Sequence, residues 1–228
     1  MQNILLRYAL KHELNVVLPK SGNYLGKSHF NADLLKGTPW EMAGMHYNIF
    51  CLHNRWNGKE VERLMGRMKN QRPIYFTILR DPVNLFVSLW DYLQLSQKYG
   101  GISLEEYALS DKVGKYQDRI HAGHFGRNQM LWDFGLSQND FENDTAVQAK
   151  IEEIEATFDL VLITEKFSES VVLLKDLLCW DFNDMTSLKL NAQKSSSKSK
   201  LSPIGNVQLS RKIVTKVTLV CLFQLAKN

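Results

Sequence analysis

The chain has 228 residues and a mass of 26.3 kDa, and 44% of its residues are hydrophobic, enough for one domain with one sizeable core. The formal net charge is +4, and the basic residues are dispersed outside residues 194–200, which gives little support to nucleic-acid binding. Cys51, Cys179 and Cys221 have no metal-ligand spacing and leave at least one thiol unpaired. Residues 1–15 lack a signal-peptide pattern, and the apolar stretch 213–226 is shorter than the ~20 residues of a membrane span, so we expect a soluble chain.

The first part of the chain alternates helix and strand signals. Apolar residues at helical spacing predict a helix over residues 2–12, and residues 14–18 predict a short strand that ends at Pro19. Residues 19–40 have no periodicity and predict a surface loop. The next predicted elements are a strand, a helix and a strand, at residues 47–52, 59–68 and 74–79. This order favours a right-handed crossover and a parallel sheet.

The second part continues the alternation. A helix is expected to begin at Pro82, and residues 103–135 are expected to be helical in pieces around a polar loop at 114–126. The remaining predicted elements are a helix, a strand, a helix and a Ser/Lys-rich loop, at residues 146–156, 160–163, 169–178 and 194–202.

The junction between the strand 74–79 and the helix at Pro82 is the most informative feature. In an open α/β sheet, ligands bind outside the carboxyl ends of the strands, and a helix N-terminus attracts phosphate. Arg80 lies at that edge, and Ser88 lies two turns into the helix. Together they could clamp one phosphate group through a charged fork and a hydroxyl. The alternative is that Arg80 pairs with Asp81 or caps the helix.

Residues 79–88, with Leu79-Arg80-Asp81-Pro82 at their start and Ser88 at their end, resemble the 3'-phosphate-binding segment of the galactose-3-O-sulfotransferase family. Further segments resemble the same family in the same order, and the likeness as a whole covers roughly residues 2–203. They are residues 3–12, 47–55, 127–135, 158–165, 169–180 and 189–192.

This resemblance implies an α/β fold with a central parallel sheet flanked by helices, the P-loop-NTPase-like sulfotransferase fold, of which this chain would hold part. It implies transfer of a sulfuryl group from 3'-phosphoadenosine 5'-phosphosulfate to the 3-hydroxyl of galactose, in a glycolipid such as galactosylceramide or in a glycan. No metal is required by that reaction, and Arg80 and Ser88 would bind the donor's 3'-phosphate.

The chain departs from the family at both ends. In the family, a Lys-Thr-x-x-Ser-Ser-Thr loop that holds the 5'-phosphosulfate precedes the helix that residues 2–8 resemble, and the chain starts after it. The resemblance fades after Pro203. We therefore expect a sulfotransferase domain at 1–203 that lacks the first strand and the phosphate loop, followed by a divergent tail at 204–228. The alternative function is an inactive fragment that keeps only the 3'-phosphate half of the site.

His53 is the first candidate for the general base, since it follows a predicted strand and an imidazole suits removal of a hydroxyl proton. Its alternative is a loop histidine that hydrogen-bonds the backbone. Arg55 could hold the donor sulfate or the acceptor, or could be a surface cation. His12, at the end of the first helix, is the second catalytic candidate, although the helix dipole favours a cation there in any protein.

Other polar residues match the family in the later part of the chain. Arg127 and Asn128 could contact the nucleotide or the sugar, with a helix-surface role as the alternative. Lys189, Asn191 and Lys194 belong to a late basic loop that lies near the donor in the family, although such residues are more commonly solvated.

Two further functions are disfavoured. His121 and His124 have a spacing that can hold a metal, but no carboxylate or cysteine partner completes a site, so no metal is expected. A nucleotide-dependent kinase would need a Walker-type phosphate loop and a carboxylate pair for Mg²⁺, and neither can be placed in the sequence.

The family consists of type II Golgi membrane proteins, whose anchor precedes the phosphate loop. The resemblance therefore implies a luminal catalytic domain at the Golgi membrane, attached through an anchor that this chain lacks. Asn143-Asp144-Thr145 is an N-glycosylation pattern, which would suit a luminal glycoprotein.

Overall fold

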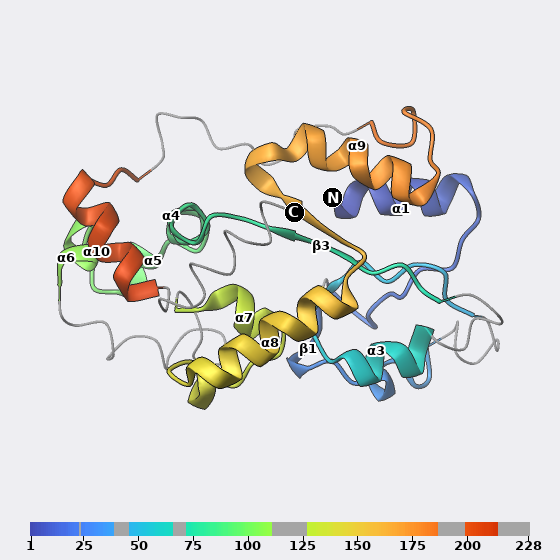
Figure 1. The fold of residues 1–228 in the computed structure, drawn as a ribbon, viewed down its shortest axis with the longest axis horizontal. Helices are drawn as coiled ribbons and strands as arrows, with labels where there is room; N and C mark the ends of the chain where they lie inside the picture. Colours follow the sequence, from blue (N-terminus) through green and yellow to red (C-terminus); the bar gives the residue numbers. More distant parts are fainter. Residues whose placement is uncertain (23, 39–45, 66–71, 111–126, 187–198, 214–228) are drawn as a thin grey trace.

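The structure is a computed structural model that describes residues 1–22, 24–38, 46–65, 72–110, 127–186 and 199–213 (Figure 1). The strands are β1 (Tyr24–His29), β2 (His53–Arg55), β3 (Phe76–Leu79) and β4 (Leu160–Ile163). The α-helices are α1 (Gln2–Lys11), α3 (Gly58–Met65), α4 (Pro82–Tyr92), α5 (Leu95–Lys98), α6 (Leu104–Leu109), α7 (Gln129–Asp133), α8 (Asp144–Thr157), α9 (Phe167–Leu178) and α10 (Pro203–Ile213). Short 3₁₀ turns lie at Ala32–Leu35, Gln138–Asp140 and Thr164–Lys166.

The described strands pair in parallel, as predicted. β3 pairs with β4 from Phe76↔Leu160 to Leu79↔Ile163, and β1 pairs with β2 with an irregular register. The expected α/β class, with parallel strands flanked by helices, is confirmed. Within the described part of the chain, however, the strands form two separate two-stranded sheets instead of one central sheet.

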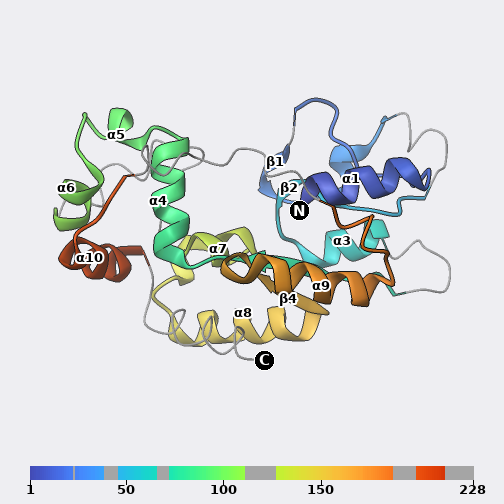
Figure 2. The same ribbon diagram turned by 90° about the horizontal axis from the view of Figure 1, so that it is seen from above.

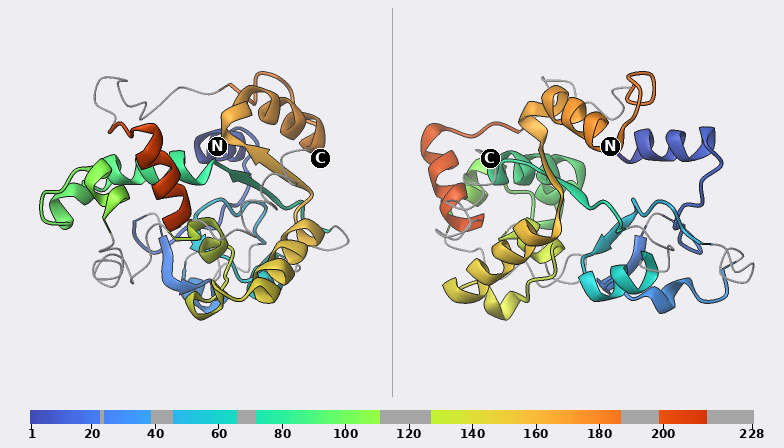
Figure 3. Two further views of the ribbon diagram at one scale, coloured as in Figure 1. Left: turned by 60° about the vertical axis from the view of Figure 1, so that its left-hand side comes forward. Right: turned by 45° about the vertical axis from the view of Figure 1, so that its right-hand side comes forward.

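Helices cover both faces of the β3–β4 pair. Leu162 packs with residues of α1 and α9, whereas its neighbours Val161 and Ile163 pack with residues of α7 and α8. This is the alternation that a strand imposes on its side chains. Figure 3 shows α1 and α9 on one side of these strands and α8 on the other. Because both faces are covered, the carboxyl ends of β3 and β4 are where a ligand is expected in an open α/β sheet.

A second cluster lies beside the strands, where α4, α5, α6 and α10 meet (Figure 2). The rings of Tyr99 and Tyr107 stack with 5.3 Å between their centroids, and Phe86 stacks on Tyr107 at the same distance. Leu209 and Ile213 of α10 are buried against this cluster. Part of the expected divergent tail is therefore a helix that packs into the core.

Three predicted elements differ from the structure. The stretch 19–40, expected to be a loop, contains β1, whose strand conformation depends on pairing with β2. The strand expected at 47–52 is wrong in position, because β2 begins at His53 and only Ile49 forms a bridge, with Val16. The strand expected at 14–18 is reduced to that bridge. Among the described residues, no helix combines the length and the apolar character that crossing a membrane requires.

Candidate functional site

Arg80 occupies the turn between β3 and α4. Asp81 is the N-cap of α4, its carboxylate accepts a hydrogen bond from the Asn84 N–H at 2.8 Å, and Pro82 follows in the first helical position. Arg80 itself is half-buried, and its guanidinium has no hydrogen-bond or ion-pair partner within the described ranges. The predicted alternative, an ion pair between Arg80 and Asp81, is therefore absent from this part of the structure. A half-buried guanidinium without a partner is available to bind an anion.

Ser88 lies on the same helix, also half-buried. It is six residues beyond Pro82, which corresponds to about 9 Å along the helix axis. No side-chain hydrogen bond of Ser88 is found among the residues that the structure describes. The phosphate clamp of Arg80 and Ser88 stays a prediction, with both side chains available for it.

The Arg80 turn is tied to the end of the neighbouring strand. The Thr164 hydroxyl donates to the Leu79 carbonyl at 2.8 Å, and the Glu165 carboxylate accepts from the Asp81 N–H at 3.1 Å. Glu165 was not predicted as a site residue. Its position two residues after a predicted strand, close to the same edge as Arg80, is the signal that could have found it.

His53 is the first residue of β2 and is exposed. It pairs in register with Tyr24 of β1, and the two rings stack with their centroids 5.0 Å apart. No hydrogen bond of its imidazole is found in the described part of the chain, so the backbone-bonded alternative is not observed there. No hydrogen bond, ion pair or ring contact between described residues joins His53 to Arg80, and its role as base stays a prediction.

Arg55, two residues further along β2, binds the backbone of a distant segment. Its Nε donates to the Trp132 carbonyl at 2.9 Å and its Nη2 donates to the Leu136 carbonyl at 2.7 Å. Burial lowers the pKa of Arg55, and the charge of Asp133 opposes this. Because both nitrogens donate to carbonyls, Arg55 links β2 to the segment from Trp132 to Leu136. A role in binding the donor sulfate or the acceptor stays a prediction.

His29 and Asp133 lie next to Arg55 and were not predicted as site residues. The His29 Nε2 is 2.9 Å from the Gly135 carbonyl, which can only accept, so this nitrogen carries the proton. The unprotonated Nδ1 then faces the Arg55 Nη1 at 3.5 Å. Asp133 keeps part of its surface open to solvent, yet burial raises its pKa to about 6 against the opposing effects of the Gln129 hydrogen bond and the Arg55 charge.

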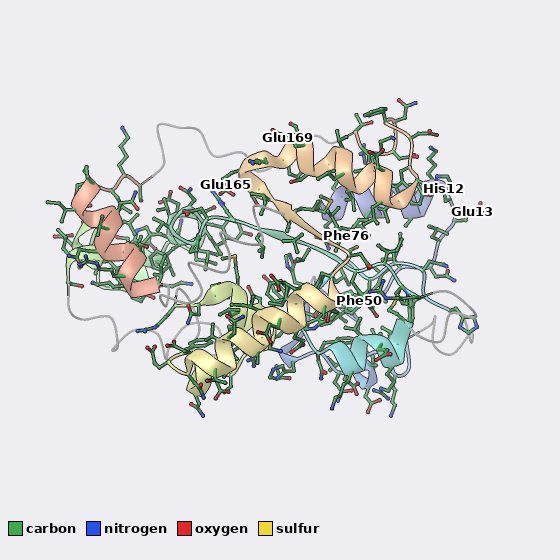
Figure 4. The ribbon with its side chains drawn as sticks, in the orientation of Figure 1. His12, Glu13, Phe50, Phe76, Glu165 and Glu169 are labelled. Carbon is green, nitrogen blue, oxygen red and sulfur yellow. The ribbon has the colours of Figure 1, made fainter. Side chains whose placement is uncertain are left out.

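His12 lies far from the Arg80 turn. It is the C-cap of α1, its ring is 4.2 Å from the Tyr8 ring, and the neighbouring Lys11 pairs with Asp184 beyond the C-terminus of α9. Glu165, which borders the Arg80 turn, lies instead before the N-terminus of α9. Figure 4 shows His12 and Glu165 at opposite ends of the α1–α9 pair. The structure does not bring His12 and Arg80 together.

The remaining predicted site residues divide into two groups. Arg127 pairs with Glu142, and Asn128 is 3% exposed at the N-cap of α7, where its N–H donates to the Ile213 carbonyl at 2.7 Å. These contacts give both residues a place in the packing of α7. The others, Lys189, Asn191, Lys194, His121 and His124, lie outside the described residues. Among the residues that are described, no group of three or more potential metal ligands occurs.

An open pocket of about 580 Å³ lies next to the Arg80 turn. It is formed by the first turn of α4 and one face of α10. Its lining residues are Asp81, Val83, Asn84, Asn206, Val207, Ser210 and Arg211. One acidic side chain, Asp81, and one basic side chain, Arg211, therefore face this open space beside the α4 N-terminus.

Comparison with known proteins agrees with the motifs. The sequence model of the family described as Galactose-3-O-sulfotransferase matches residues 1–215, a range that includes α10. The galactosylceramide sulfotransferase of Homo sapiens is 36% identical over 205 residues, which cover 88% of this chain and 47% of the relative. The galactose-3-O-sulfotransferase 2 of Sus scrofa is 33% identical over 213 residues, which cover 92% of this chain and 52% of the relative.

The galactosylceramide sulfotransferase of Bos taurus is similar to the same degree, with 35% identity over 204 residues that cover 88% of this chain and 47% of the relative. The chain thus spans about half the length of these relatives. No solved structure is detectably similar to it. The resemblance inferred from the separated motifs is confirmed: the chain belongs to the galactose-3-O-sulfotransferase family.

Proposed function

We propose that this protein is a sulfotransferase that moves a sulfuryl group from 3'-phosphoadenosine 5'-phosphosulfate to the 3-hydroxyl of a galactose residue. Membership of the family supports the reaction, since relatives carry the names galactosylceramide sulfotransferase and galactose-3-O-sulfotransferase. The acceptor is a galactose at the end of a glycolipid, as in galactosylceramide, or of a glycan.

One observation carries the donor half of the proposal. Arg80 is a half-buried cation that follows β3, has no partner within the described residues, and lies directly before Asp81, the N-cap of α4. A guanidinium in that position can donate two hydrogen bonds to one phosphate group, and the helix dipole adds a favourable potential. In the proposed site, Arg80 and Ser88 bind the 3'-phosphate of the nucleotide.

The chemistry resembles phosphoryl transfer, in which the protein mainly positions the reactants and stabilises charge. The acceptor oxygen attacks sulfur as the bond from sulfur to the phosphate oxygen breaks, and the hydroxyl proton passes to a base. His53 is the proposed base, because its exposed imidazole has no hydrogen bond within the described part of the chain and can accept that proton. The scheme needs no metal.

The proposed location is the Golgi lumen, as family resemblance suggests. Asn143 of the glycosylation pattern is exposed at the N-cap of α8, where its Oδ1 accepts from the Ala146 N–H at 3.2 Å. A glycan on the side-chain nitrogen would leave that oxygen available. After expression in a secretory pathway, removal of N-glycans should raise gel mobility, and Asn143→Gln should abolish the change.

Nucleotide binding tests the donor site directly. Titration calorimetry would compare adenosine 3',5'-bisphosphate with adenosine 5'-phosphate, which lacks the 3'-phosphate. A charge-assisted hydrogen bond contributes about 1.5–3 kcal/mol. Arg80→Ala should therefore weaken binding of the bisphosphate by roughly 10- to 150-fold, and Ser88→Ala should weaken it by less. Arg7→Ala, which changes an exposed arginine of α1, is the control. Equal binding of the bisphosphate by wild type and Arg80→Ala would remove the donor-site assignment.

Transfer of labelled sulfate to galactosylceramide and to a lactose-terminated glycan tests the reaction. A matched acceptor methylated at the galactose 3-hydroxyl should receive no label. Protein that binds the bisphosphate with normal Arg80 dependence but labels neither acceptor would contradict the proposed reaction while leaving the nucleotide site intact.

A further inference from the structure

The residues that follow β4 hold the backbone on both sides of Arg80. Beyond the last register pair of β3 and β4, two side chains extend the connection between the strands. The Thr164 hydroxyl donates to the Leu79 carbonyl at 2.8 Å, and the Glu165 carboxylate accepts from the Asp81 N–H at 3.1 Å. That carbonyl and that N–H belong to the two peptide units that flank the Arg80 Cα. Both backbone torsions of Arg80 are therefore restrained by consecutive residues of the neighbouring turn.

A buried serine fixes the turn that carries these side chains. The Ser170 hydroxyl accepts from the Ile163 N–H at 3.0 Å and donates to the Ile163 carbonyl at 3.1 Å, and Ser170 is 5% exposed. Because Ile163 immediately precedes Thr164, the end of β4 is held from α9 on one side and bonded to the Arg80 turn on the other.

We propose that Thr164 and Glu165 are positioning residues that orient Arg80 toward the 3'-phosphate of the nucleotide; this inference rests on the proposed function. The direction in which a side chain leaves the main chain is set by the two peptide units around its Cα. The guanidinium of Arg80 has no partner of its own among the described residues, so the neighbouring turn controls it through the backbone alone. A cation held in this way loses less conformational freedom when it binds a phosphate.

Glu165 serves the site through its hydrogen bond and not through its charge. A carboxylate close to a bound phosphate would repel it, whereas the oxygen that accepts from the Asp81 N–H can belong to a carboxylate or to an amide. Glu165→Gln keeps an oxygen acceptor without the charge and should bind adenosine 3',5'-bisphosphate at least as tightly as wild type. Glu165→Ala removes the acceptor and should weaken binding. Equal weakening by Gln and Ala would overturn this part of the inference.

The experiment measures affinity for adenosine 3',5'-bisphosphate and for adenosine 5'-phosphate in the whole protein. Thr164→Val should weaken binding of the bisphosphate by about two- to tenfold, the range for one neutral hydrogen bond, and Glu165→Ala by at least as much. Both should leave binding of the monophosphate unchanged. Thr164→Ser keeps the hydroxyl and should restore wild-type affinity. Glu169→Ala is the matched control, since Glu169 is an exposed glutamate in the first turn of α9, near Glu165 in Figure 4, without a hydrogen bond among the described residues.

A double-mutant cycle separates positioning from general loosening of the fold. If Thr164 and Glu165 act through Arg80, then Thr164→Val and Glu165→Ala should change bisphosphate affinity by less than about twofold in the Arg80→Ala background. Equal losses in both backgrounds would overturn the inference. Because Glu165 is exposed, Glu165→Ala keeps the test informative even if Thr164→Val fails to fold.

Amide hydrogen exchange tests the hydrogen bond from the Asp81 N–H to Glu165 in the absence of nucleotide. Exchange of the Asp81 amide should accelerate in Glu165→Ala and not in Glu169→Ala, and an unchanged rate would contradict the bond. If Arg80→Ala weakens the bisphosphate but neither neighbouring variant does, only the positioning role fails. If Arg80→Ala has no effect, the proposed donor site fails.

Discussion

Arg55 contacts Trp132 in two ways at once. Its guanidinium lies 4.5 Å from the centroid of the Trp132 ring, and its Nε donates a 2.9 Å hydrogen bond to the Trp132 carbonyl. A third contact, from Nη2 to the Leu136 carbonyl at 2.7 Å, fixes the far end of the same segment. The planar guanidinium of arginine can stack on a ring and donate to two carbonyls at the same time, whereas the ammonium of lysine cannot.

Arg55→Lys should therefore destabilise the fold. A lysine keeps the charge but cannot reach both carbonyls while lying over the ring, so the free energy of unfolding should fall by about 1–3 kcal/mol. Denaturant unfolding followed by circular dichroism measures the change. Arg7→Lys, at an exposed arginine without a contact among the described residues, should stay within about 0.5 kcal/mol of wild type. Similar losses in the two variants would show that the contacts of Arg55 contribute no stability.

Gly135 lies within the segment that Arg55 holds, and its substitution should be costly for two separable reasons. Its φ is +93°, and an added Cβ would lie 2.6 Å from the Trp56 carbonyl oxygen. Gly101 has a similar φ of +84°, but an added Cβ there meets nothing within 4 Å. Gly101→Ala should thus cost only the backbone strain, about 1–3 kcal/mol, and Gly135→Ala clearly more. Thermal unfolding of both variants checks this, and an equal cost would mean that the Trp56 backbone yields without penalty.

The strands that position the proposed donor site could be predicted because their signals are local. β3 and β4 are runs of apolar and β-branched residues, and the Asp-Pro pair after β3 marks a helix start whatever the rest of the fold does. β1 could not be predicted, because Gly26, Lys27 and Ser28 give no apolar alternation. Its strand conformation comes from pairing with β2, which is distant in sequence.

The same distinction explains what was missed at the site. Arg80 is recognisable from its neighbours in sequence, whereas the carbonyls that hold Arg55 are 77 and 81 residues away and carry no side-chain signature. The bond from the Asp81 N–H to Glu165 spans 84 residues and depends on the parallel register of β3 and β4. The sequence can indicate which residue types lie at a sheet edge. The register of the paired strands determines which of these residues form hydrogen bonds with one another.

Asp159 makes stability depend on pH. Its carboxylate accepts from the Arg72 Nη1 at 2.5 Å and from the Tyr75 N–H at 2.8 Å, which holds the chain just before β3. Burial alone would raise the pKa of Asp159, but these hydrogen bonds and the Arg72 charge outweigh it and lower the pKa. A lowered folded-state pKa contributes stability that is complete above the unfolded value of about 3.9 and is lost as the pH falls through the folded value.

Asp159→Asn should accordingly be less stable than wild type near neutral pH, and the difference should shrink as the pH falls below about 4. Urea unfolding at neutral, mildly acidic and strongly acidic pH measures it. Asp140→Asn, at an aspartate for which no ion pair is found in the described part of the chain, is the control. A wild-type advantage that is the same at every pH would mean that the charge of Asp159 is not involved.

His53 offers the sharpest test of the proposed chemistry. It is exposed at the start of β2 and stacks on Tyr24 without a hydrogen bond among the described residues, so its substitution should leave folding intact. General base catalysis contributes about 10²- to 10⁴-fold, and His53→Ala should lower kcat for sulfate transfer by that range with little change in KM. His46→Ala, at another exposed histidine whose side chain has no bond in the described ranges, should keep full turnover. Near-normal turnover of His53→Ala would remove His53 as the base.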